Sequence, residues 1–85
     1  MTLIGERIAT CMARVDTPGN LRLLEQLLKV VVNTSAVPGG QLIVARHLFS
    51  LLFEAVDTKK IGAVRQQLAW KALQNLRKHP VGGSR

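Results

Sequence analysis

Apolar residues recur along this 85-residue chain at a spacing close to 3.6 residues, in four consecutive segments separated by turn signals. This spacing places apolar side chains on one face of an α-helix, whereas a strand would need strict alternation. The first helix is expected over about residues 3 to 15, with Thr2 as its N-cap and "DTPGN" as the turn that follows. We therefore expect an all-α protein without a sheet. The apolar stripe of this helix consists of Ile4, Ile8, Cys11, Met12 and Val15.

The second helix is expected to begin between residues 18 and 21, with Thr17 or Asn20 as its N-cap, and to end near residue 32 or 33. Its apolar side chains cover about 200° of the helix surface, which leaves a narrow polar strip. The valines at positions 30 to 32 also suit a short strand, but no other segment offers it a partner. The apolar set is Leu21, Leu23, Leu24, Leu27, Leu28, Val30, Val31 and Val32, and the polar strip is Arg22, Glu25, Gln26 and Lys29.

A third helix is expected over residues 41 to 56, after a loop formed by "NTSAVPGG". Its polar residues fall within an arc of about 100°, and apolar residues occupy most of the remaining surface. This width predicts that the third helix is the most buried one. The polar arc contains Arg46, His47, Ser50 and Glu54, and the apolar part contains Leu42, Val44, Ala45, Leu48, Phe49, Leu51, Leu52, Phe53 and Val56.

The fourth helix is expected to begin after "VDTKK", with Asp57 or Thr58 as its N-cap, and to end near Lys78. "HPVGGSR" follows and stops it. We expect one helical domain over residues 1 to 79, built as a bundle of about four helices, and a flexible tail over residues 80 to 85. The inward face of the fourth helix is Ile61, Val64, Leu68, Ala69, Ala72, Leu73 and Leu76, and the centre of the core is expected at Leu24, Leu28, Leu48, Leu52 and Leu68.

The apolar content of 47% is high for so short a chain, because a small domain has a large surface for its volume. Each helix of a small bundle has only two or three neighbours, so apolar arcs of about 200° are more than an isolated monomer covers. This surplus predicts a homodimer or a helical protein partner that covers the second and third helices. A compact monomer is the alternative.

The net charge of +7 is concentrated at one end of the sequence. Basic and acidic residues cancel over residues 1 to 58, whereas residues 59 to 85 contain seven Lys or Arg residues and no carboxylate. A basic helix of this kind is typical of proteins that bind nucleic acid, RNA or DNA. The outward face of the fourth helix is expected to hold Lys59, Lys60, Gln67, Trp70, Lys71, Gln74, Arg77 and Lys78.

Trp70 is the only tryptophan of the chain, and the helical projection places it on this basic face rather than among the apolar residues. Three roles fit such a position. The indole can pack over its own helix, because tryptophan tolerates a partly wet site. It can anchor a partner protein, since Trp beside Arg is common in interface hot spots. It can also stack on an unpaired base while the basic side chains contact phosphates.

Other candidate chemistry is weak. One cysteine and two histidines do not match a zinc-binding pattern, so no metal site is expected. Cys11 lies on an apolar stripe and is expected to be a buried thiol, His47 a residue of a polar strip, and His79 part of a helix end. We expect no enzyme activity, cofactor, small-molecule substrate or membrane span, and a soluble intracellular location. The leading hypothesis is a non-enzymatic interaction or assembly module, and the alternative is a nucleic-acid-binding protein.

Overall fold

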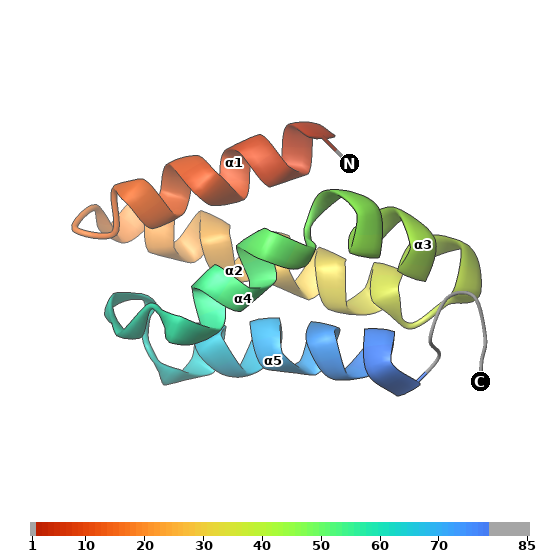
Figure 1. The fold of residues 1–85 in the computed structure, drawn as a ribbon. Coiled ribbons are helices and arrows are strands. Elements are labelled where there is room, and N and C mark those ends of the chain that lie inside the picture. Colours follow the sequence, from red (N-terminus) through yellow and green to blue (C-terminus); the bar gives the residue numbers. More distant parts are fainter. Residues whose placement is uncertain (1, 79–85) are drawn as a thin grey trace.

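The computed structural model describes residues 2 to 78 and shows an all-α fold, as the apolar spacing predicts. Within this range no strand is present, and the three valines at positions 30 to 32 belong to a helix. His79 and the predicted tail over residues 80 to 85 lie outside the described residues. The elements are α1 (Thr2–Ala13), α2 (Pro18–Ser35), α3 (Pro38–His47), α4 (Phe49–Asp57), the short 3-10 helix η1 (Lys59–Ile61) and α5 (Ala63–Lys78) (Figure 1).

The segment predicted as the loop "NTSAVPGG" is mostly helical, which corrects the sequence prediction. α2 continues to Ser35, and α3 begins at Pro38, so only residues 36 and 37 connect them. The hydroxyl of Thr34 donates to the carbonyl of Val30 at 2.8 Å, and that of Ser35 donates to the carbonyl of Val32 at 2.9 Å. These bonds to the preceding turn satisfy side chains that otherwise favour loops.

The corner between α2 and α3 is tight because position 40 has no side chain. A Cβ atom on Gly40 would meet the carbonyl oxygen of Thr34 at only 1.9 Å, far inside contact distance. Gly40 is itself buried, so the two helices could not separate there without opening the core. Pro38 occupies the first turn of α3, where its missing N–H leaves no hydrogen bond unmade.

The predicted third helix is broken at Leu48, so the described residues form five α-helices, and the expected count of about four is not confirmed. Leu48 has φ −122° and ψ −2°, outside the helical range, and its side chain is fully buried. Neither glycine nor proline marks this break. A Cβ atom on Gly5 of α1 would lie 3.1 Å from Leu48 Cδ2, so the bend seats Leu48 in a close contact with α1.

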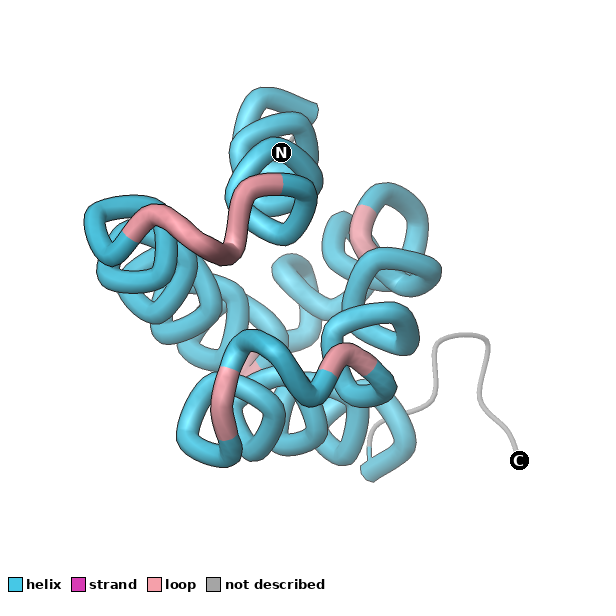
Figure 2. The backbone as a smooth tube through the Cα atoms, turned by 90° about the vertical axis from the view of Figure 1, so that its left-hand side faces the viewer, coloured by secondary structure: helices cyan, strands magenta, loops and turns pink. Residues whose placement is uncertain are grey.

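The helices pack around α2, which contacts α1, α3 and α5, while α4 lies against α5 and also touches α1 (Figure 2). Leu24, Leu28, Leu48 and Leu52 are buried as predicted, whereas Leu68 is only half-buried. The core contains no aromatic side chain. It consists of Ile8, Cys11, Leu24, Leu28, Val31, Val44, Leu48, Leu52, Ala55, Ile61, Ala69, Ala72, Leu73 and Leu76.

The apolar faces predicted for the third and fourth helices include residues that the structure places on the surface. Leu42 of α3 is exposed, and so are Phe49 and Phe53 of α4, although all three were expected to face the interior. The bend at Leu48 explains the difference, because the two short helices each turn only part of the apolar arc inward. Val64 was also expected to face inward, but it is 59% exposed at the start of α5.

Candidate functional site

The predicted basic face of α5 and η1 lies on the surface. The side chains that are exposed are Lys59, Lys60, Gln67, Trp70, Lys71, Gln74 and Arg77. α5 ends at Lys78, whose side chain lies outside the described part of the chain. The face is therefore accessible to a partner, although accessibility alone does not identify one.

Three residues of this face line two separate hollows, which lie on opposite sides of α5. Trp70 and Arg77 line a cavity of about 190 Å³ on the α4 side. Lys71 lines a separate cavity of about 280 Å³ on the α2 side, together with Lys29. The first cavity is lined by Phe49, Phe53, Trp70, Leu73 and Arg77, which we call the aromatic pocket. The second is lined by Lys29, Val32, Asn33, Leu68 and Lys71.

All three aromatic residues of the sequence, counting Phe, Tyr and Trp, line the aromatic pocket. The exposed fractions of Phe49, Phe53 and Trp70 are 45%, 49% and 43%. Phe49 and Phe53 follow each other by one turn of α4, and their rings meet edge to face with centroids 4.8 Å apart. Large aromatic side chains are usually buried, but here they are exposed and the core is aliphatic. An exposed apolar cluster of this kind favours a binding surface.

Phe49 and Phe53 were missed as site residues because the projection of a single helix places them inward. The helical period does pair them at positions i and i+4, and this is the only sequence signal that they belong together. Their contact with the Trp70 region depends on the hairpin of α4, η1 and α5, in which the two helices run antiparallel (Figure 1).

Arg65 belongs to the basic segment but not to the basic face. Its side chain is only 21% exposed, and Nε donates to the carbonyl of Leu21 at 2.7 Å. Nη1 donates to the carbonyl of Ile61 at 3.0 Å, and Nη2 lies 3.5 Å from Oε1 of Glu25 in α2. Residues 59 to 85 contain no carboxylate, and the acidic partner of Arg65 is Glu25 of α2. Arg65 therefore stabilises the packing of α5 on α2.

Amide side chains hold α5 in place against α2, α3 and α4. Gln66 Nε2 donates to the carbonyl of Val56 at 2.8 Å, which satisfies a carbonyl near the end of α4. Asn75 Nδ2 donates to the carbonyl of Val32 at 3.2 Å and to the hydroxyl of Ser35 at 3.1 Å. The buried Gln41 of α3 donates to the carbonyl of Asn75 at 3.3 Å. These bonds fix the position of α5 and, with it, the wall of the aromatic pocket.

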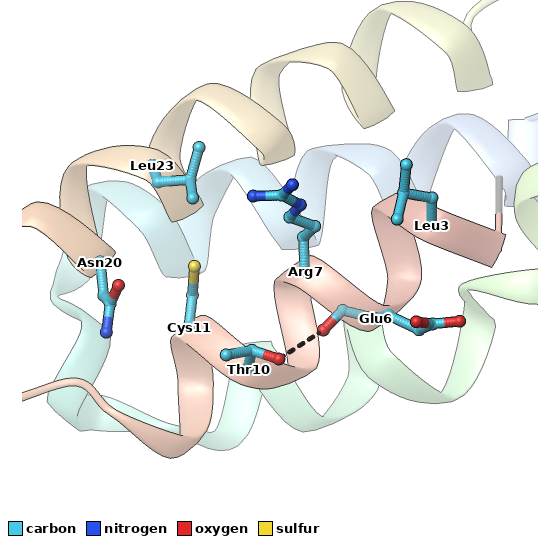
Figure 3. A pocket seen from close by; sticks show the side chains of 7 residues that line it. All are labelled: Leu3, Glu6, Arg7, Thr10, Cys11, Asn20 and Leu23. Carbon is cyan, nitrogen blue, oxygen red and sulfur yellow. Dashed lines mark hydrogen bonds between the residues drawn. The ribbon is translucent and has the colours of Figure 1, made fainter.

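A third hollow, of about 320 Å³, lies between α1 and α2 and includes Cys11 and Arg7 (Figure 3). Both side chains point from α1 toward α2, but Cys11 is only 1% exposed. Burial raises the pKa of the Cys11 thiol, and the nearby charge of Arg7 partly opposes this shift. The thiol is thus a buried, protonated core group at neutral pH, as its place on the apolar stripe predicts.

Metal chemistry has no support among residues 2 to 78, where no three His, Cys, Asp or Glu side chains gather closely enough to hold an ion. Each helix within that range is too short or too polar to span a bilayer. None of the protein-family models, curated proteins or solved structures compared with this chain matches it. A proposal for the function therefore depends on the surfaces described above.

Proposed function

We propose that this protein is a non-enzymatic interaction module that binds a partner polypeptide in the aromatic pocket between α4 and α5. The observation that carries the proposal is the exposure of all three aromatic side chains around one cavity that also contains Arg77. Trp and Arg are enriched among the residues that dominate binding energy, and aromatic rings contribute large contact areas. Catalysis has no comparable support, because this pocket contains no nucleophile, acid or base.

The pocket is built on rigid elements, which favours binding with little loss of conformational entropy. Phe53 lies on the outer side of α4, while its neighbour Leu52 is fixed in the core. Trp70 lies on α5 beside the buried Ala69, and the hydrogen bond from Gln66 to α4 joins the two helices. A partner would therefore meet side chains that are already positioned.

Selection of peptides from a random displayed library tests this proposal without knowledge of the natural partner. Peptides selected on the native protein are expected to lose binding to Phe53→Ser, because that change removes half of the aromatic pair. Val64→Ser is the matched control, since Val64 is an exposed apolar residue of α5 that does not line the pocket. Circular dichroism checks that each variant is folded. If selected peptides bind Phe53→Ser as well as the native protein, the pocket is not the docking site.

Self-association through a different surface is a separate candidate function. Leu42 and Ile43 of α3 are exposed together, outside the aromatic pocket, and a second copy could cover them. Sedimentation equilibrium at about 100 μM is expected to show a dimer that Leu42→Ser weakens. A monomer at that concentration, without binding of a hydrophobic dye, would exclude self-association through this surface.

Nucleic-acid binding is another candidate, supported by Lys29 and Lys71 on either side of the α2–α5 cavity and by the exposed Trp70. If it is correct, Lys71→Ala should weaken binding about equally for all sequences and reduce the salt dependence, because it removes about one phosphate contact. Trp70→Ala should weaken single strands more than duplexes, by about 1 to 3 kcal/mol for one stacked base. Absence of binding at about 50 mM salt would exclude this candidate.

A further inference from the structure

Arg77 is the charged residue of the aromatic pocket, and it takes part in neither ion pair of the described residues. Between residues 2 and 78, both ion pairs end on Glu25: one comes from Lys29 and the other from Arg65. Arg77 has no acidic partner among the described residues, although it lines the pocket and is exposed. Its guanidinium group keeps five N–H donors for a ligand.

The surroundings of the pocket reinforce this positive character. α5 contains no Asp or Glu, whereas Lys59 and Lys60 of η1 lie at the end of the hairpin that is away from Arg77. The carboxylates of α4, Glu54 and Asp57, lie in its C-terminal half, whereas Arg77 in the last turn of the antiparallel α5 is on the side of the N-terminal Phe49. An anion at the Arg77 end of the pocket is therefore favoured and a cation is not.

We infer that the partner is an acidic amphipathic helix, an inference that depends on the proposed docking function. Aliphatic side chains one helical turn apart enter between Phe49, Phe53 and Trp70, and a neighbouring Asp or Glu pairs with Arg77. A helix suits this site because the pocket lies between two packed antiparallel helices, and apolar anchors spaced by three or four residues fill such a site. The forked guanidinium of Arg77 can receive both carboxylate oxygens.

Two other occupants fit the pocket less well. A second copy of this chain carries +7 and would present its own carboxylate-free α5, so that like charges would meet across the pocket. A nucleic-acid strand needs several cations along its backbone, but this pocket holds one Arg, and Lys29 and Lys71 lie on the other side of α5. An acidic, apolar helix satisfies both the rings and the charge.

Three synthetic peptides distinguish these occupants. Each is an alanine-rich helix without Trp or Tyr, with leucines at positions i, i+3, i+4 and i+7, and they differ only in flanking residues: Glu, Gln or Lys. Because Trp70 is the only tryptophan of the protein and lines the pocket, its fluorescence reports binding directly. The Glu peptide is expected to bind about fivefold more tightly than the Gln peptide at low salt and to lose that advantage at high salt.

Arg77→Gln is expected to abolish the preference, so that the Glu peptide binds this variant no more tightly than the Gln peptide does. Arg22→Gln is the matched control, because it removes the same charge from an exposed position on α2 that does not line the pocket. This control should retain the preference.

Several results would overturn the inference. Equal binding of the Glu and Gln peptides, with both lost in Phe53→Ser, would leave the docking function intact and show that the partner is not selected for acidity. Tighter binding of the Lys peptide would reverse the sign of the expected charge. If no peptide changes the Trp70 fluorescence while library selection yields binders that depend on Phe53, the docking function stands and the acidic helix is wrong. Displacement of the Glu peptide by oligothymidylate, with Arg77→Gln weakening both ligands, would assign the pocket to nucleic acid instead.

Discussion

The two sides of α5 use similar residues in opposite ways. On the side of α2, Arg65 and Asn75 donate hydrogen bonds to backbone carbonyls of α2, and Arg65 also pairs with Glu25. On the side of α4, Trp70 and Arg77 remain exposed around a cavity. The arginine on the α2 side is thus held by contacts within the fold, whereas the arginine on the α4 side is exposed.

Arg65 and Arg77 show why a count of basic residues is a poor guide to a binding surface. Both belong to the segment that gives the chain its positive charge, yet only Arg77 keeps its donors free among the described residues. The charge of Arg65 is balanced by a carboxylate that lies 40 residues earlier in the sequence. The electrostatic surface therefore follows from the packing of α5 on α2 and not from the sequence segment alone.

The same contrast exists within α4, where Leu52 is 1% exposed and Phe53 is 49% exposed. Leu52→Ala should reduce the free energy of unfolding by about 2 to 5 kcal/mol, because a cavity remains in the core. This is comparable to the whole stability of a small domain. Phe53→Ala, its neighbour and control, should lower stability by less than about 1 kcal/mol, mainly through its contact with Phe49. Urea unfolding followed by circular dichroism measures both, and equal losses would show that Phe53 is a core residue.

Two arginine substitutions compare the two sides of α5. Their expected effects on the free energy of unfolding are smaller than that of Leu52→Ala. Arg65→Gln should lower the free energy of unfolding by about 1 to 3 kcal/mol, because the carbonyl of Leu21 loses its donor and Glu25 keeps only Lys29 as a cationic partner. Arg77→Gln should change it by no more than about 0.5 kcal/mol, as expected for an exposed side chain. Thermal unfolding at one pH compares the two. A larger loss in Arg77→Gln would show that this residue also belongs to the fold.

Much of this fold follows from local sequence patterns. The 3.6-residue spacing predicts the helices at both ends of the chain, and Pro18 marks the start of α2, because periodicity and capping are local properties. Leu24, Leu28 and Leu52 are buried as predicted, since each lies near the middle of its apolar arc. These features need no knowledge of which helices are neighbours.

The features that were not predicted depend on contacts between distant residues. The break at Leu48 has no glycine or proline signal and coincides with a close contact to Gly5 of α1. The partner of Arg65 is known only once α5 is seen against α2. For the candidate site, Trp70 and Arg77 could be identified from the helical projection, but Phe49 and Phe53 could not, because their exposure results from that break.

Cys11 lies between the buried core and an exposed hollow. Its titration should change the free energy of unfolding less than the substitutions above. It lines the hollow between α1 and α2, but its side chain is nearly inaccessible (Figure 3). Burial raises its pKa in the folded state, so the unfolded chain releases the thiol proton first as pH rises. Stability should be unaffected by this group below about pH 8.5 and should fall by up to about 1 kcal/mol by pH 9.5.

Cys11→Ala provides the reference for this measurement, since it shares the lysine titrations of the native protein but lacks the thiol. The difference in unfolding free energy between the two proteins should narrow from pH 7 to pH 9.5, because only the native protein loses the stability linked to the thiol. A thiol-specific reagent should label the native protein slowly, at a rate that urea increases, because labelling requires the helices to open. Rapid labelling without denaturant, together with a difference that does not vary with pH, would show that Cys11 is reached through the hollow between α1 and α2. In that case the thiol belongs with Trp70 and Arg77 among the groups available to a ligand.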